Sequence, residues 1–68
     1  MARTKVVSSN IHSIGYENNT LEVCFLSGWV YHYYNVPEEY YTYMITHNHP
    51  GTFLCRYIKC CYQYKRVA

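Results

Sequence analysis

The feature that most constrains this chain is a pair of strand-like segments joined by a very short turn. Every second residue from Leu21 to Phe25 is apolar, which is the period of a β-strand with one buried face. Ser27-Gly28 is a turn signal, and residues 29–35 are rich in the aromatic side chains that strands favour. A connection this short permits only antiparallel pairing, so the sequence predicts a β-hairpin.

The flanking residues extend this hairpin to a β-β-β-α-α order. Residues 11–16 are a further strand candidate, and a polar turn at residues 17–20 separates them from the hairpin. Pro37 and Pro50 each suit the first position of a helix, and apolar residues recur at helical spacing after both. Residues 62–67 either continue the second helix or form a short edge strand.

We therefore expect a single domain over residues 1–68, of the α+β class. Its predicted architecture is a small antiparallel three-stranded meander with two helices packed on one face. The apolar stripes of these elements should form a largely buried core. The predicted core residues are Leu21, Val23, Phe25, Ile45, Phe53, Leu54 and Ile58.

Chain length and composition argue against catalysis. A chain of 68 residues forms a core too small to surround a deep substrate cavity. Its ten tyrosines, two phenylalanines and one tryptophan supply large buried areas with few rotatable bonds, which helps so small a core to hold together. We expect no enzyme activity and no bound cofactor.

Tyr31 and Tyr33 share one face of their strand because side chains alternate, and the preceding turn decides which face that is. A two-residue turn at Ser27-Gly28 directs both rings away from the apolar face, where they would be free to stack on unpaired bases. A three-residue turn with Gly28 in the left-handed conformation directs them onto the apolar face. The second arrangement is favoured because it turns the polar His32 outward, but the residue pattern alone leaves both open.

Four basic residues near the C-terminus form a candidate contact for nucleic acid. Arg56 and Lys59 lie one turn apart on the polar face of the second predicted helix, and Lys65 and Arg66 follow closely. Such a stripe would suit the phosphates of a nucleic acid. The formal net charge is only +2, which fits ordinary solubilising charge equally well.

The histidines and cysteines do not form a recognisable metal or catalytic motif. His47-Asn48-His49 is predicted to be a loop between the helices. Structural zinc sites use cysteine pairs at short spacings, whereas Cys60 and Cys61 are adjacent. Cys55 has basic neighbours but no orienting acid at a recognisable spacing. We expect no metal site, and we expect the four cysteines to be small buried side chains.

No targeting or membrane-spanning signal is recognisable. Residues 1–10 lack the apolar segment of a secretory signal, and no apolar run approaches the ~20 residues that cross a bilayer. We therefore expect a cytoplasmic protein with reduced cysteines and no membrane partner.

A set of residues in one order and spacing carries a family resemblance. Its centre is Tyr31-His32-Tyr33 followed by Val36-Pro37. Around this centre lie Ser8-Ser9, Ile14-Gly15-Tyr16, Leu21, Val23, Phe25, Gly28, Gly51, Ile58 and Tyr62. Over roughly residues 7–64 this set resembles the KTSC domain, named for the C-terminal extension of some lysyl-tRNA synthetases and also found as stand-alone small proteins. The chain departs from the family pattern at residues 47–50 and at Cys55, where the family has Asn. The resemblance implies RNA binding, which has been suggested for the family without an established mechanism.

These observations predict a non-catalytic interaction module that binds RNA or another nucleic acid weakly. The alternative is a protein–protein adaptor that uses exposed aromatic surface or a free sheet edge. Dependence on salt separates the two, because phosphate contacts weaken steeply with ionic strength. The candidate contacts to nucleic acid are Arg56, Lys59, Lys65 and Arg66 for phosphates, and Tyr31 and Tyr33 for bases.

Overall fold

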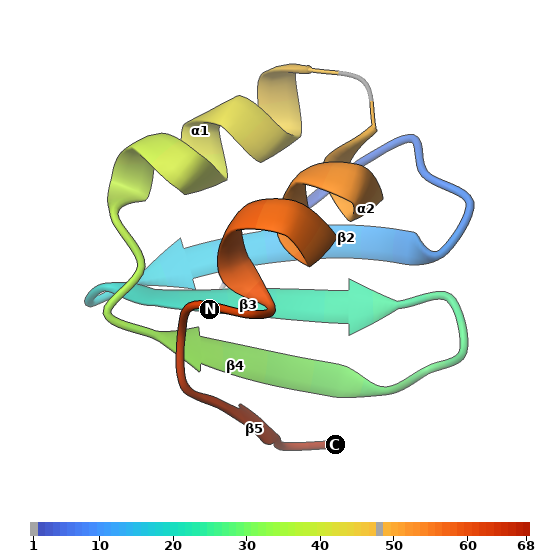
Figure 1. Ribbon diagram of the computed structural model, residues 1–68. Coiled ribbons are helices and arrows are strands. Elements are labelled where there is room, and N and C mark those ends of the chain that lie inside the picture. Colours follow the sequence, from blue (N-terminus) through green and yellow to red (C-terminus); the bar gives the residue numbers. More distant parts are fainter. Residues whose placement is uncertain (1, 48) are drawn as a thin grey trace.

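The structure is one antiparallel sheet with two helices on one of its faces (Figure 1). It is a computed structural model that describes residues 2–47 and 49–68. Its elements, in chain order, are β1 (Arg3–Lys5), β2 (Ile11–Glu17), β3 (Thr20–Phe25), β4 (Val30–Tyr34), α1 (Glu38–Thr46), α2 (Pro50–Phe53), the π-helical turn η1 (Leu54–Ile58) and β5 (Tyr64–Arg66). Because α2 runs directly into η1, the two together form the second predicted helix.

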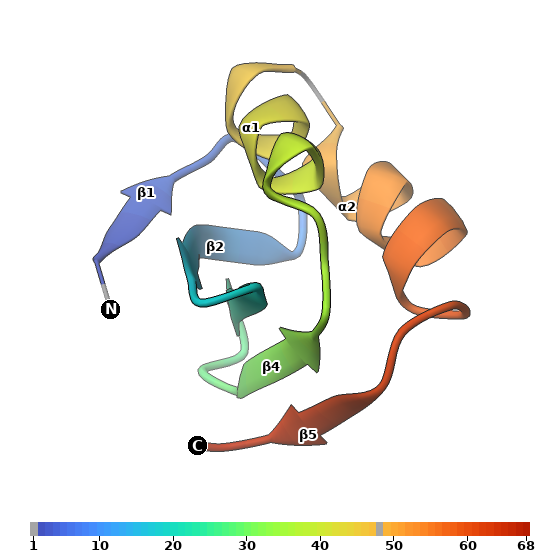
Figure 2. The same cartoon turned by 90° about the vertical axis from the view of Figure 1, so that its left-hand side faces the viewer.

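The sheet has five strands in the order β1-β2-β3-β4-β5. Figure 2 shows β1 beyond β2 at one end of the sheet and β5 beside β4 at the other. The predicted α+β class is confirmed, whereas the prediction of three strands is wrong. β1 and β5 are each three residues long, and every one of their residues is exposed, so neither strand has an alternating pattern of burial. They form because the edges of β2 and β4 offer backbone groups that need partners.

The turn between β3 and β4 is the three-residue turn that the sequence favoured. Gly28 has a φ of +101°, a conformation that glycine adopts without a steric cost. The backbone N–H of Phe25 donates a hydrogen bond to the Trp29 carbonyl at 2.9 Å. These two residues therefore close the turn as a pair.

This turn places the two central tyrosines on the helix-covered face of the sheet. Tyr31 pairs with Val23, and Tyr33 pairs with Leu21. Directly opposite residues in an antiparallel pair point to the same side, so both rings join the apolar face and His32 lies on the other. Tyr33 is 1% exposed and Tyr31 is half-buried, which answers the question that the residue pattern left open.

The core lies between the sheet and the helices. Four of the predicted core residues are buried there: Leu21, Val23, Leu54 and Ile58. Phe25, Ile45 and Phe53 are only half-buried and pack against the core from its margin, so their prediction as largely buried is wrong. Their places are taken by residues that the apolar stripes did not single out. These are Ile11, Ile14, Tyr33, Val36 and Met44.

The opposite face of the sheet carries a charged network centred on Glu22. Arg3 Nε donates a hydrogen bond to Glu22 Oε1 at 2.7 Å, and His32 Nε2 lies 2.8 Å from Glu22 Oε2. Gly15 lies between Arg3 and Glu22 in the strand register, so no side chain separates the two ions. Burial alone raises the pKa of Glu22, but the hydrogen bonds to His32 and Arg3 outweigh it and hold that pKa below its usual value.

We expect acid to remove the stabilisation that this network provides. A carboxyl whose folded-state pKa is lowered contributes stability above its unfolded pKa of about 4.3, and that stability is lost as the pH falls through the folded value. Urea denaturation between about pH 3 and 7 should therefore show a smaller loss on acidification in Glu22→Gln than in the wild type. Glu17→Gln, at an exposed position, is the matched control and should follow the wild type. Parallel curves for wild type and Glu22→Gln would contradict this role.

Candidate functional site

A groove of about 510 Å³ opens between the sheet and the second helix. We call it the aromatic groove because five of its lining residues carry aromatic rings. Its lining consists of Ser9, Asn10, Phe25, Leu26, Ser27, Trp29, Tyr31, Tyr33, Lys59 and Tyr64. The volume falls in the range of roughly 300–1,000 Å³ that is typical of small-ligand sites.

Tyr31 is the centre of the rings in this groove. Its centroid lies 5.5 Å from that of Phe25, 6.4 Å from Trp29, 6.3 Å from Tyr33 and 5.7 Å from Tyr64. These distances are those of interacting aromatic pairs. The rings converge because β3, β4, β5 and the residue just before β4, Trp29, present them from one face of the sheet.

The rings differ in how much of each is open to a ligand. Trp29 and Tyr64 are 51% and 57% exposed, whereas Tyr33 is 1% exposed. Burial, followed by the proximity of Tyr31 and Tyr64, raises the pKa of Tyr33 to about 12. Tyr33 therefore supports the groove from below, and Trp29 and Tyr64 offer the ring surface that a ligand can reach.

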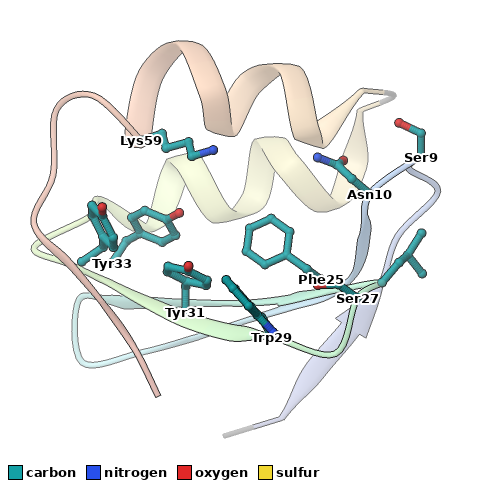
Figure 3. Close-up of a pocket in the computed structure, with 10 residues that line it drawn as sticks. Ser9, Asn10, Phe25, Ser27, Trp29, Tyr31, Tyr33 and Lys59 are labelled. Atoms are coloured by element: carbon teal, nitrogen blue, oxygen red, sulfur yellow. The ribbon is translucent and has the colours of Figure 1, made fainter. Parts of the chain in front are cut away.

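Two cationic side chains border the rings. Lys59, immediately after η1, lines the groove from the helix side, and Figure 3 shows its ammonium group reaching over the rings. Arg66 pairs with Tyr31 across β4 and β5, and its guanidinium carbon lies 4.7 Å from the centroid of Trp29. This is the distance of a cation–π contact, so positive charge meets the groove from both the helix and the sheet edge.

The other two basic residues of the predicted stripe lie elsewhere. Arg56 lines a separate, more polar hollow of about 370 Å³ together with Ser8 and His49. Lys65 pairs with His32 and so lies on the opposite face of the sheet from Tyr31. The structure thus brings together Lys59, Arg66 and the two tyrosines of the sequence prediction, and separates Arg56 and Lys65 from them.

Among the groove residues that the residue patterns did not single out are Trp29, Tyr64 and Asn10. Trp29 reaches it because the three-residue turn places this ring on the face of Tyr31. Tyr64 reaches it through the pairing of β5 with β4; the residue pattern left a helix and a short edge strand open for residues 62–67, and the structure has the strand. Asn10 lies in the loop before β2, where a polar residue is ordinary, so no sequence signal could have identified it.

The cysteines differ from the prediction. Cys24 is half-buried, but Cys55, Cys60 and Cys61 are exposed, and all four are free thiols. Leu54 and Ile58 occupy the buried side of the helix, which leaves the intervening and following cysteines facing water. Within residues 2–47 and 49–68, no three His, Cys, Asp or Glu side chains are grouped as metal ligands. Asn48 of the predicted His47–His49 loop lies outside the described residues.

A second group of rings covers the outside of the helices. Tyr43 stacks on His47 at 3.9 Å and on Phe53 at 4.5 Å between centroids, and Phe53 lies 4.9 Å from Tyr57. Tyr43 and Tyr57 are 42% and 52% exposed. We call these four residues the helical ring stack. Within residues 2–47 and 49–68, the cation–π contact found is that of Arg66 with Trp29, and none involves this stack. Among the described helices, none has the length and apolar character required to cross a bilayer.

The five-stranded antiparallel sheet, the two helices on one face and the ligand-sized groove define a small α+β domain. The KTSC domain family matches residues 7–62, and this chain belongs to that family, as the ordered set of residues around Tyr31-His32-Tyr33 indicated. The crystal structure of a KTSC domain protein from Yersinia pestis is similar, with a TM-score of 0.91 and 32% sequence identity over 98% of this chain and 97% of the other. No curated protein matches the chain.

Proposed function

We propose that this KTSC domain is a non-catalytic module that binds single-stranded RNA in its aromatic groove. The observation that carries the proposal is the combination of accessible rings with two cations at one groove. Proteins that bind unpaired nucleotides stack the bases on aromatic side chains and neutralise the phosphates with lysine or arginine.

The arrangement of charge suits a nucleotide chain better than an isolated apolar ligand. Lys59 approaches the rings from the helix, and Arg66 approaches them from β5. A base stacked on Trp29 or Tyr64 would thus have a cation on either side for the phosphates that flank it. The proposal narrows the predicted basic stripe to these two cations, because Arg56 and Lys65 lie away from the rings.

A protein–protein adaptor is the second candidate, and the helical ring stack is the observation that favours it. Half-exposed tyrosines on a helix surface are a common component of protein interfaces. In the part of the chain that the structure describes, no lysine or arginine makes a cation–π contact with these rings, so we expect binding through this surface to depend less on salt. The two candidates therefore use different faces of the molecule and respond differently to ionic strength.

The proposal predicts weak, salt-sensitive binding of an unstructured RNA oligomer. Two phosphate contacts on a single strand give a slope of about −1.4 in log affinity against log salt, or about a sevenfold loss between roughly 50 and 200 mM. Reversing both charges in Lys59→Glu, Arg66→Glu should reduce the affinity by about tenfold or more. Trp29 is the only tryptophan of the chain, so its fluorescence reports stacking directly during the titration.

The control for this titration is a second double variant of equal charge. Arg56→Glu, Lys65→Glu changes the net charge by the same amount at residues outside the aromatic groove, and it should retain most of the wild-type affinity. Equal losses in the two double variants would show that only overall charge matters. No binding by the wild type at low salt would reject the proposal and leave the adaptor.

A further inference from the structure

Resting on the proposed function, we infer that the aromatic groove prefers uracil to cytosine, and that Asn10 is the residue that distinguishes them. The inference starts from how the loop before β2 fixes the side-chain amide of Asn10. It depends on which of the two amide atoms, the oxygen or the nitrogen, faces the groove.

Ser8 determines the orientation of that amide. Ser8 Oγ accepts hydrogen bonds from the backbone N–H groups of Asn10 and Ile11, at 3.3 and 3.2 Å. A hydroxyl has two acceptor lone pairs and one proton, so its proton is left to donate to Asn10, 2.9 Å away. The atom that receives it must be the acceptor of the amide, Oδ1, and the NH₂ group must occupy the other position.

The second helix packs against the same amide oxygen. A Cβ added at Gly51 would lie 2.6 Å from Asn10 Oδ1, which is closer than real Cβ contacts. The absence of a side chain at Gly51 therefore lets α2 approach the loop on this side of the Asn10 amide. Gly51 leaves room for the amide at this position, and the hydroxyl of Ser8 decides which of its two atoms occupies it.

The NH₂ group of Asn10 points into the aromatic groove. Figure 3 shows it directed toward the ammonium group of Lys59, with the Phe25 ring below and between them. Among residues 2–47 and 49–68, Asn10 Nδ2 has no hydrogen-bond acceptor and Lys59 has no carboxylate partner. The two opposite walls of the groove thus each present an unused donor above an aromatic floor.

A base that lies between these walls is favoured if it offers acceptors to both. Uracil has carbonyl oxygens on both sides of its ring. Cytosine has one carbonyl and one amino group, and the amino group is a donor. Whichever way cytosine enters, its amino group faces either Asn10 Nδ2 or Lys59. The hydroxyls of Ser9 and Ser27 can donate or accept, so they do not alter this preference.

The test compares two oligomers of equal length, oligouridylate and oligocytidylate, by Trp29 fluorescence. The wild type should bind the uridine oligomer about three- to tenfold more tightly than the cytidine oligomer, which corresponds to the net contribution of one hydrogen bond. In Asn10→Asp the variant carboxylate keeps one oxygen toward Ser8 and turns the other into the groove, where it accepts from the cytosine amino group. We expect the ratio of the two affinities to fall to one or invert. The added negative charge lowers the affinity for both oligomers by the same factor, so this effect cancels in the ratio of the two affinities.

Two further variants complete the experiment. Asn18→Asp makes the same charge change in the β2–β3 turn and should keep the wild-type ratio. Ser8→Ala releases the amide without adding charge and should bring the ratio toward one. It provides an independent measurement if Asn10→Asp folds poorly.

Each outcome bears on a separate claim. Equal, salt-sensitive binding of both oligomers by the wild type would overturn the uracil preference and leave the proposed function standing. A uracil preference that survives in Asn10→Asp would overturn the assignment to Asn10. Binding of neither oligomer would reject the proposed function, and this inference with it.

Discussion

Replacing Leu21 by alanine is expected to lower the free energy of unfolding by about 2–5 kcal/mol, the usual cost of truncating a fully buried leucine. Leu21 is 0% exposed and lies in the core beneath the helices. At roughly 0.05–0.15 kcal/mol per residue, a chain of 68 residues is stabilised by only about 3–10 kcal/mol. The variant should therefore be partly or wholly unfolded at 37 °C, as far-ultraviolet circular dichroism and urea denaturation would reveal.

The matched comparison for Leu21→Ala is Phe25→Ala, four positions along the same strand and on the same face. The alternating pattern predicted that Phe25 is largely buried, and truncating a fully buried phenylalanine costs about 3–5 kcal/mol, but this ring is half-buried and borders the aromatic groove. We now expect Phe25→Ala to be clearly less destabilising than Leu21→Ala, because part of the ring is already in contact with water. Equal losses in the two variants would mean that the groove is closed in solution.

Alkaline pH should destabilise the fold through Tyr33. A group whose folded-state pKa is raised contributes stability that is complete below its unfolded pKa, about 10 for tyrosine, and that is lost as the pH rises through the folded value. For Tyr33 that value is about 12, because the ring is buried beside Tyr31 and Tyr64. A difference of about two pKa units corresponds to roughly 2–3 kcal/mol.

The measurement is the free energy of unfolding between about pH 9 and 12 in wild type, Tyr33→Phe and Tyr57→Phe. The chain has ten tyrosines, so the informative quantity is the difference between each variant and the wild type. Tyr33→Phe should lose stability less steeply with rising pH, whereas Tyr57→Phe, at a site on the helices that is 52% exposed, should follow the wild type. A wild-type slope retained in Tyr33→Phe would place the responsible group elsewhere.

The local elements were predictable because their causes lie close together in the chain. Alternation from Leu21 to Phe25 specifies one strand, and Gly28 specifies a turn that needs a positive φ. Pro37 ends the extended segment before α1. The choice between the two turns was correct because directing the polar His32 away from the core costs less free energy than directing two tyrosine rings away from it. The same reasoning found four core residues and failed for Phe25, Ile45 and Phe53, which pack against the core from its margin.

The candidate site was predictable only in part. The sequence identified the two tyrosines, Tyr31 and Tyr33, and four basic residues as candidates. Nothing in the local sequence distinguishes Lys59 and Arg66, which lie at the groove, from Arg56 and Lys65, which do not. Their separation depends on β5, whose register with β4 sends Arg66 to the face of Tyr31 and Lys65 to the face of His32. A shift of one residue in that pairing would exchange them.

By itself, the sequence determined the α+β class, the central hairpin and its turn, the starts of both helices and membership of the KTSC family. These depend on periodicity, turn chemistry and an ordered set of residues, all of which can be read along the chain. The tertiary structure alone decided that β1 and β5 join the sheet, that three cysteines face water, and that Asn10, Trp29, Lys59 and Tyr64 share one groove. The physical reason is that strand pairing and helix docking join residues distant in sequence, through backbone hydrogen bonds and packing contacts that leave no local pattern.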